Sequence, residues 1–246
     1  MKKATPDYES HVARKEEARK FLATLEGFLK EKIGPSSEVK AAIDDIARRA
    51  KASTTERHLA FPEGAFLNHY AAPLIHEFLV NRLNLTKESA RIALLSESYR
   101  HQPKFASNSP ASKERHPFTK SVGEDLDSIV TRWWKDGEGS AICQSCPDLA
   151  IGLPCPYKVV FEGKYFRHGS SAFAKHELIR DIYQCFFYLG LPRVPATGRH
   201  AAWEYDYACL LAYDASGGNL KIAWQGIKDE VKMGMWKGAN IYVIVL

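Results

Sequence analysis

The hydrophobic positions follow a helical spacing through the first half of the chain. Between residues 8 and 32 the apolar side chains recur every three or four positions, which predicts an amphipathic helix; they are Phe21, Leu22, Leu25, Phe28 and Leu29. The same spacing predicts helices at 39–50, 64–83 and 86–99, and Pro73 is expected to kink or break the third. The first half is therefore expected to be a helical region.

The second half changes to short apolar runs between turn residues, a pattern typical of strands. Helices are predicted at 121–134 and 173–189. The expected strands are 141–142, 149–151, 159–161, 207–213, 220–224 and 241–246. Residues 217–219, Gly-Gly-Asn, predict a hairpin turn between two of these strands. The alternation of helices and strands predicts a mixed α/β fold, with a central mixed sheet flanked by helices.

Composition and charge narrow the function only slightly. The 246 residues are 45% hydrophobic and 26% charged, which is ordinary for a globular protein. A net charge of +5 permits nucleic-acid binding without requiring it. A run of about 18 apolar residues, as a membrane span needs, is absent from the sequence. The charged N-terminal residues do not resemble a secretory signal, so a cytoplasmic location is expected.

An acidic residue, Asp148, opens one of the predicted apolar strands. A carboxylate is costly to bury there unless it is paired or binds a metal. On the next predicted strand, Glu162 and Lys164 are two positions apart and share a face, with Gly163 between them. If the two strands pair, Asp148 lies near Glu162, and a cation between them would relieve their repulsion. Mg²⁺ suits such oxygen ligands.

Lys164 would then lie beside the metal and the substrate. Its ammonium could orient the attacking water, help to deprotonate it, or neutralise charge that develops on a phosphate. An Asp followed by a Glu-x-Lys is a loose pattern in a chain with 29 acidic and 34 basic residues. A purely structural role for these residues therefore stays open.

The segments Pro147-Asp148 and Glu162-Gly163-Lys164 resemble the signature of the PD-(D/E)XK nuclease superfamily. The resemblance covers residues 121–215. It implies a restriction-endonuclease-like core of helix, three strands, helix and strand, and hydrolysis of phosphodiester bonds with Mg²⁺ or Mn²⁺. By this resemblance Asp148 and Glu162 are metal ligands, the Gly163 carbonyl is a further ligand, and Lys164 is the catalytic lysine.

Two more residues are candidates by the same resemblance. Many members add an acid from the helix before the first strand, and Glu124 is the candidate, with Glu138 second; Glu124 could equally be a first-turn acid that the helix dipole favours. Gln184 and Tyr188 share a helix face and are similar to the Gln-x-x-x-Tyr element of the RecB-like branch. A tyrosine that only packs is the alternative.

The five cysteines include a Cys-x-x-Cys pair, Cys143 and Cys146, with Cys155 nine residues later. A structural zinc site needs four ligands. Because the sequence has no second Cys-x-x-Cys pair, the spacing favours free thiols over zinc. It also contains no Gly-rich phosphate loop ending in Lys-Ser or Lys-Thr, so no nucleotide cofactor is expected.

The expected function is therefore a Mg²⁺-dependent DNA endonuclease, most simply a type II restriction enzyme. Its partner would be double-stranded DNA, and a homodimer would suit a symmetric site. Residues 1–120, which end in a basic stretch, would serve DNA recognition or dimerisation, and residues 121–246 would form the nuclease core. The alternatives are a RecB-like repair or phage exonuclease and a non-catalytic DNA-binding module on the same fold.

Overall fold

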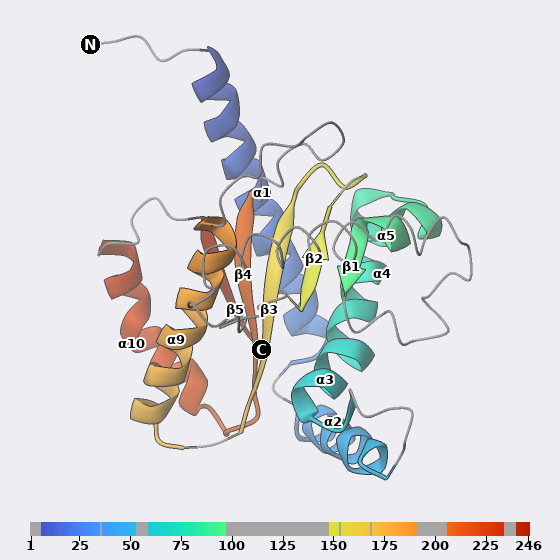
Figure 1. Ribbon diagram of the computed structural model, residues 1–246, viewed down its shortest axis with the longest axis vertical. Coiled ribbons are helices and arrows are strands. Elements are labelled where there is room, and N and C mark those ends of the chain that lie inside the picture. The colour runs from blue at the N-terminus through green and yellow to red at the C-terminus, as the bar shows by residue number, and fades with distance from the viewer. Residues whose placement is uncertain are drawn as a thin grey trace, which may run out of the picture.

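The computed structural model describes residues 6–34, 36–52, 59–96, 148–152, 154–167, 169–190, 206–233 and 240–246. Its helical elements are α1 (Pro6–Lys32), α2 (Ser37–Ala50), α3 (Pro62–Phe66), η2 (Leu67–Ala71), α4 (Ala72–Leu83), α5 (Lys87–Ala93), α9 (Ser171–Gly190) and α10 (Asn219–Met233). Its strands are β1 (Leu94–Ser96), β2 (Leu149–Ile151), β3 (Val159–Phe166), β4 (Tyr207–Asp214) and β5 (Ile241–Val245) (Figure 1).

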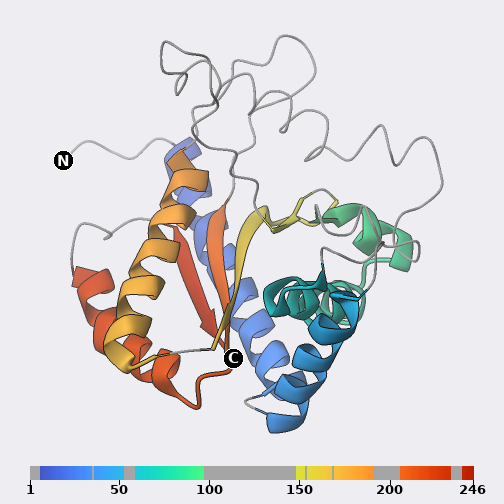
Figure 2. The same cartoon turned by 60° about the horizontal axis from the view of Figure 1, so that its bottom comes forward.

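The five strands form one mixed sheet in the order β1-β2-β3-β4-β5. Strand β2 runs antiparallel to β1 and to β3, whereas β3, β4 and β5 are parallel neighbours. Parallel neighbours need a crossover connection. Helix α9 lies between β3 and β4 in the chain, and α10 lies between β4 and β5 (Figure 2). The predicted mixed α/β class, with helices flanking a central mixed sheet, is confirmed.

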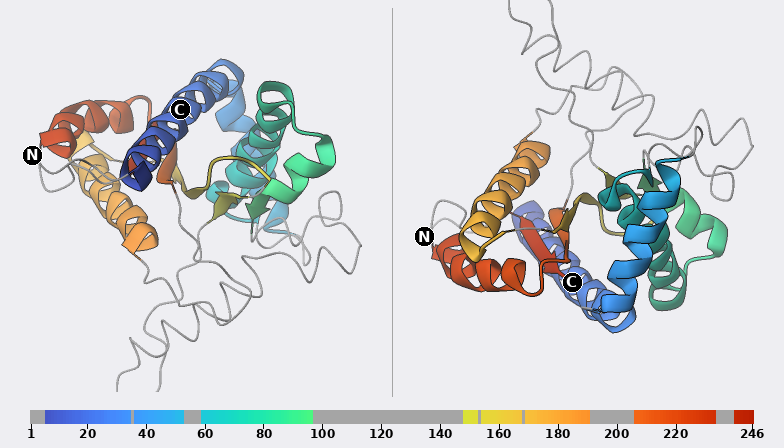
Figure 3. Two further views of the ribbon diagram at one scale, coloured as in Figure 1. Left: turned by 90° about the horizontal axis from the view of Figure 1, so that it is seen from above. Right: turned by 90° about the horizontal axis from the view of Figure 1, so that it is seen from below.

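Helices cover both faces of the sheet. Figure 3 shows α1 on one side of the strands and the pair α9–α10 on the other. Strand β3 contributes to both layers, because successive side chains point to opposite faces. Val159 and Phe161 pack in the core with α1, whereas Val160 and Phe166 pack with α9 and α10.

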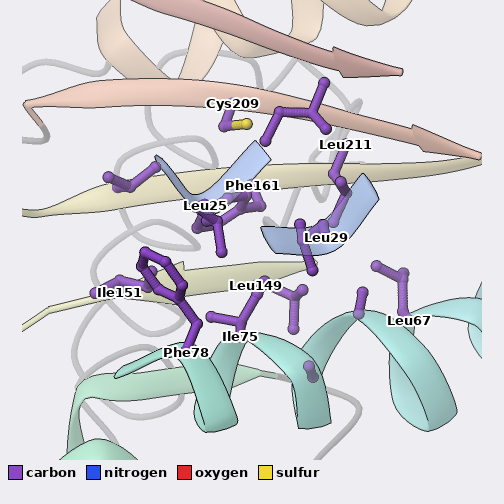
Figure 4. Close-up of a cluster of buried hydrophobic side chains, with 14 of the residues drawn as sticks. Leu25, Leu29, Leu67, Ile75, Phe78, Leu149, Ile151, Phe161, Cys209 and Leu211 are labelled. Carbon is purple, nitrogen blue, oxygen red and sulfur yellow. The ribbon is translucent and has the colours of Figure 1, made fainter. Parts of the chain in front are cut away.

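The larger core joins both halves of the chain. Leu25 of α1 and Phe78 of α4 pack with Leu149 and Phe161 of the sheet (Figure 4). The predicted boundary at residue 120 lies outside the described residues. The described residues on its two sides share this core.

Three predicted helices occur close to their expected bounds: α1, α2 and α9. The region predicted as one helix at 64–83 is divided into α3, the one-turn π-helix η2 and α4. Pro73 lies in the first turn of α4, directly after η2, in agreement with the predicted break. A proline ring clashes with the carbonyl four residues earlier, and a widened turn relieves that clash. Of the described helices, none is long and apolar enough to cross a membrane.

The predicted strand at 220–224 is wrong, because these residues lie in α10. Leu220, Ala223 and Ile227 are buried at helical spacing. A short apolar run such as 220–224 is compatible with a strand and with a buried helix face, so the run alone does not distinguish them. The predicted hairpin at 217–219 is wrong for the same reason. Gly217 and Gly218 have positive φ angles of 78° and 107° and lead from β4 into α10.

The predicted helix at 86–99 is too long. Helix α5 ends at Ala93, and the chain continues as the edge strand β1, paired with β2. Leu94 and Leu95 support either structure, and pairing with β2 decides between them. The predicted helix at 121–134 and strand at 141–142 lie outside the described residues.

Candidate active site

The site lies beside β3 at the start of β2. The pairing of Leu149 with Phe161 places Asp148, one residue earlier, at the level of Glu162. The Gly163 N–H donates a 2.7 Å hydrogen bond to Asp148 Oδ2. The Asp148 side chain thereby replaces the strand partner that β3 lacks beyond Phe161 in the described part of the chain.

Glu162 and Lys164 lie on the α9 face of β3, as their spacing predicts. Lys164 Nζ lies 2.7 Å from Glu162 Oε1. The Glu162 side chain is only 4% exposed, whereas that of Lys164 is 21% exposed. The ion pair therefore has a buried acid at its base and an ammonium that reaches toward solvent.

A third acid arrives from the helical region. Glu63, in the first turn of α3, places Oε2 3.8 Å from Lys164 Nζ, and its side chain is 40% exposed. Helix α3 packs close to β3: a Cβ added to Gly163 would lie 2.3 Å from Leu67 Cδ2. Only glycine at this position lets the helical region approach the strand so closely.

A fourth acid comes from α9. Asp181 is 4% exposed, and its Oδ1 accepts hydrogen bonds of 3.1 and 3.0 Å from the Arg180 guanidinium. Cys185, one helical turn later, is buried and lies close enough to Glu162 and Asp181 for their charges to raise its thiol pKa, after burial itself. The predicted Gln184 is partly buried on the same helix, three residues after Asp181.

The electrostatics of the site reflect a surplus of negative charge. Burial first, and the charge of Glu162 second, raise the pKa of Asp148 to about 7, although the Gly163 N–H opposes the shift. Burial also raises the pKa values of Glu63 and Asp181. Burial lowers the pKa of Lys164, but the carboxylates of Glu63 and Glu162 outweigh it and hold this pKa above the ordinary value.

These residues fit a hard divalent cation. In the described structure, Asp148 Oδ1 accepts no hydrogen bond, so one oxygen is free to bind a ligand. The Gly163 carbonyl lies on the same edge of β3 as its N–H, because both groups of a strand residue point the same way. No group of three or more His, Cys, Asp or Glu in the described ranges is arranged as a metal site. Mg²⁺ needs only one or two carboxylates, since waters and phosphates complete its shell.

Several predicted residues cannot be placed at the site. Glu124, Glu138, Cys143 and Cys146 lie outside the described residues, and nothing is described of the Tyr188 side chain. Cys155 is buried, and burial raises its pKa to about 11. The structure does bring together Asp148, Glu162, Gly163 and Lys164.

Glu63 and Asp181 were not among the predicted site residues. The signal for Asp181 is an acid within an apolar helix stripe, between Leu178 and Cys185, both of which are buried. Glu63 carries no such signal. A proline followed by an acid is an ordinary helix start, and only the tertiary structure places this acid beside Lys164.

Comparison with known protein families, curated proteins and solved structures finds no match. The function must therefore be inferred from the chemistry of the site and its place in the fold.

Proposed function

We propose that this protein is a metal-dependent nuclease that hydrolyses phosphodiester bonds in DNA, most simply an endonuclease. One observation carries the proposal: Asp148 and Glu162, on neighbouring strands, lie close enough that the charge of Glu162 helps to raise the pKa of Asp148 to about 7. Two carboxylates in such proximity, one buried and one half-buried, are unfavourable without a cation, and Arg180 offsets only Asp181, which leaves Lys164 to balance Asp148, Glu162 and Glu63.

The topology around the site supports the same proposal. Three antiparallel strands, β1 to β3, are followed by α9 and then by the parallel strand β4. This order agrees with the three strands, helix and strand that a PD-(D/E)XK resemblance implies. The site lies at the middle of β3, beside the first residue of β2, so substrate can approach an edge that the described strands leave unpaired.

Asp148, Glu162 and the Gly163 carbonyl would hold the magnesium ion. When bound, the ion would supply Lewis-acid stabilisation of the phosphate and activation of water. Asp148 Oδ2 is kept in place by the Gly163 N–H, so its other oxygen can face the ion without reorganisation.

Lys164 would stabilise negative charge on the scissile phosphate rather than act as a base. Its neighbours hold its pKa above the ordinary value, so it carries a proton at neutral pH. Glu63 and Glu162 lie 3.8 and 2.7 Å from its Nζ and hold the ammonium between them. Glu63, whose side chain is 40% exposed, would add a carboxylate for the cation or its waters.

The test is cleavage of plasmid DNA by the wild-type protein and by Asp148→Asn, with Mg²⁺ or with a chelator. Asparagine preserves the size of the side chain and the acceptor for the Gly163 N–H, but removes the charge. We expect metal-dependent cleavage by the wild type and a loss of about a thousandfold in the variant. Asp45→Asn, at a solvent-facing acid of α2, is the matched control and should cut normally. Cleavage by Asp148→Asn at the wild-type rate would refute the proposal.

Sequencing of the product ends separates the modes of cleavage. Discrete internal ends mean a site-specific endonuclease, such as a restriction enzyme, whereas progressive loss from the termini means a RecB-like exonuclease. DNA binding without cleavage under any metal condition would favour the non-catalytic DNA-binding module.

A further inference from the structure

The turn that follows Glu63 has two unusual features. It is a one-turn π-helix, Leu67–Ala71, between two α-helical segments. π-helical turns are rare and are frequent at functional sites. Within it, Asn68 is only 2% exposed, and its Oδ1 has no hydrogen-bond partner in the described part of the chain. A buried amide oxygen without a partner lowers the stability of a fold.

The same turn makes the closest approach to the strand that carries Glu162 and Lys164. Leu67 packs directly over Gly163, where an added Cβ would lie within 2.9 Å of the Leu67 Cδ1, Cδ2 and Cγ atoms. Figure 4 shows Leu67 at one end of the cluster, on the helical segment that also carries Ile75 and Phe78. The turn therefore lies so close to β3 that no side chain fits at Gly163 without moving Leu67.

Glu63 is tied to this contact. It lies four residues before Leu67, so the two side chains project from the same side of the helix. The Asn68 side-chain amide donates a 2.7 Å hydrogen bond to the Gly64 carbonyl, next to Glu63. A contact at Leu67 and a bond at Gly64 together fix the first turn of α3, and with it the Glu63 carboxylate.

We infer that the π-helical turn Leu67–Ala71 is a positioning element: the contact of Leu67 with Gly163 holds the Glu63 carboxylate at Lys164. A side chain at Gly163, or a smaller one at Leu67, would let α3 shift along β3. A shift of about 1 Å is enough to impair a catalytic arrangement. The inference rests on the proposed function, because it assigns Glu63 to the cation site.

The test is a double-mutant cycle between Leu67→Ala and Glu63→Gln, read by calorimetric titration with Mn²⁺ and by plasmid cleavage. If Leu67 acts through Glu63, then Leu67→Ala weakens Mn²⁺ binding and cleavage about tenfold in the wild-type background. In the Glu63→Gln background it should change neither. Equal factors in both backgrounds would mean that Leu67 has only a structural role.

Leu79→Ala is the matched control for lost core packing. Leu79 is fully buried and lies on α4, whereas the three atoms nearest to an added Gly163 Cβ all belong to Leu67. Both leucine variants should lose thermal stability, but only Leu67→Ala should weaken Mn²⁺ binding. The same loss in both variants would overturn the inference.

A second pair of variants tests the contact from the strand. Gly163→Ala should impair Mn²⁺ binding and cleavage, because its Cβ would displace Leu67. Adding Leu67→Ala frees that space and should recover binding at least to the level of Leu67→Ala alone, whereas no recovery contradicts the inference. If the wild type neither binds Mn²⁺ nor cuts DNA, the proposed function falls as well. If Asp148→Asn abolishes both but the Glu63 and Leu67 variants match the wild type, only this inference falls.

Discussion

Two acidic sites in this fold differ in how their charges are balanced: the single acid Asp206, and the four acids around Lys164. Asp206, just before β4, is 6% exposed, and both of its oxygens are occupied. Its Oδ1 accepts a 2.8 Å bond from Arg14, and its Oδ2 accepts bonds from Arg14 and from the Lys158 N–H at 3.2 and 2.7 Å. At the second site, Asp148, Glu162, Glu63 and Asp181 lie around the ammonium of Lys164, and Arg180 offsets only Asp181.

The difference separates a structural acid from a candidate functional one. Asp206 joins α1 to the starts of β3 and β4, and its partners offset the cost of burial. The cluster at Lys164 leaves charge unbalanced and raises the pKa of Asp148 to about 7. Perturbed acids in surplus are the usual mark of a catalytic or metal site.

The largest effect is expected at the central cation. Lys164→Met keeps the length of the side chain but removes the charge, so it should slow cleavage by about a hundred to a thousandfold. Lys164→Arg should recover only part of the rate, because a planar guanidinium does not match a point charge. The check is single-turnover cleavage of a labelled duplex at saturating Mg²⁺. An unchanged rate in Lys164→Met would remove this residue from the reaction.

The next effect is a pH dependence of stability in the absence of metal. The pKa of Asp148 rises from 3.8 to about 7 in the folded state. Between these values the folded protein keeps a proton that the unfolded chain has lost, so the contribution of Asp148 to stability is greatest below pH 4 and is lost as pH rises to 7. The loss should be on the order of 2 to 4 kcal/mol.

Asp148→Asn should reduce this slope, of which Glu63 and Asp181 supply the remainder, and make the metal-free protein more stable than the wild type at pH 7 to 8. Urea unfolding at several pH values measures both effects. In the wild type, Mn²⁺ binding should strengthen as pH rises through 7, because a proton competes with the metal. A variant with the same pH slope as the wild type would show that Asp148 is not the titrating group.

Neutralising Asp206 should have the opposite effect on stability to neutralising Asp148. Asp206→Asn removes the charge that both Arg14 and the Lys158 N–H contact, so it should destabilise the fold by about 2 kcal/mol. Cleavage per folded molecule should not change at a temperature well below unfolding. The measurements are urea unfolding and cleavage with the folded fraction taken into account. A gain in stability would contradict the structural role of Asp206.

The sequence predicts those residues of the site that lie on one strand or on strands adjacent in the chain, but not those that a distant segment supplies. The spacing of Glu162 and Lys164 and the hairpin of two short strands placed Asp148 beside them correctly. Glu63 was beyond such reasoning, because only the packing of Leu67 on Gly163 brings α3 to the strand. A contact of this kind leaves no periodic signal in the sequence.

For the fold as well, local patterns were predictive and contacts between distant segments were not. Long amphipathic segments such as α1 were predicted nearly to their ends. The short run at 220–224 has no period of its own, and its place in α10 depends on the parallel pairing of β4 with β5, which requires a crossover between them. Likewise, Leu94–Ser96 becomes strand β1 because β2 is there to pair with it.

The smallest effect is expected at Asp44, a half-exposed acid that links α2 to the end of β3. It accepts hydrogen bonds from Tyr165 at 3.1 Å, Arg167 at 2.7 Å and Lys40 at 3.1 Å. Asp44→Asn should cost about 1 kcal/mol or less, and less still in high salt, because solvent screens exposed pairs. Thermal unfolding at two salt concentrations measures the loss of stability. A loss in Asp44→Asn as large as that in Asp206→Asn would contradict the expected difference between exposed and buried acids.

The most direct test of the unbalanced cluster is the position of a metal in a crystal of the protein soaked with Mn²⁺, located by anomalous scattering. The account predicts a peak in contact with the carboxylates of Asp148 and Glu162, and its loss in Asp148→Asn. An empty site in the wild type at a Mn²⁺ concentration that supports cleavage, or a peak only at other residues, would contradict it.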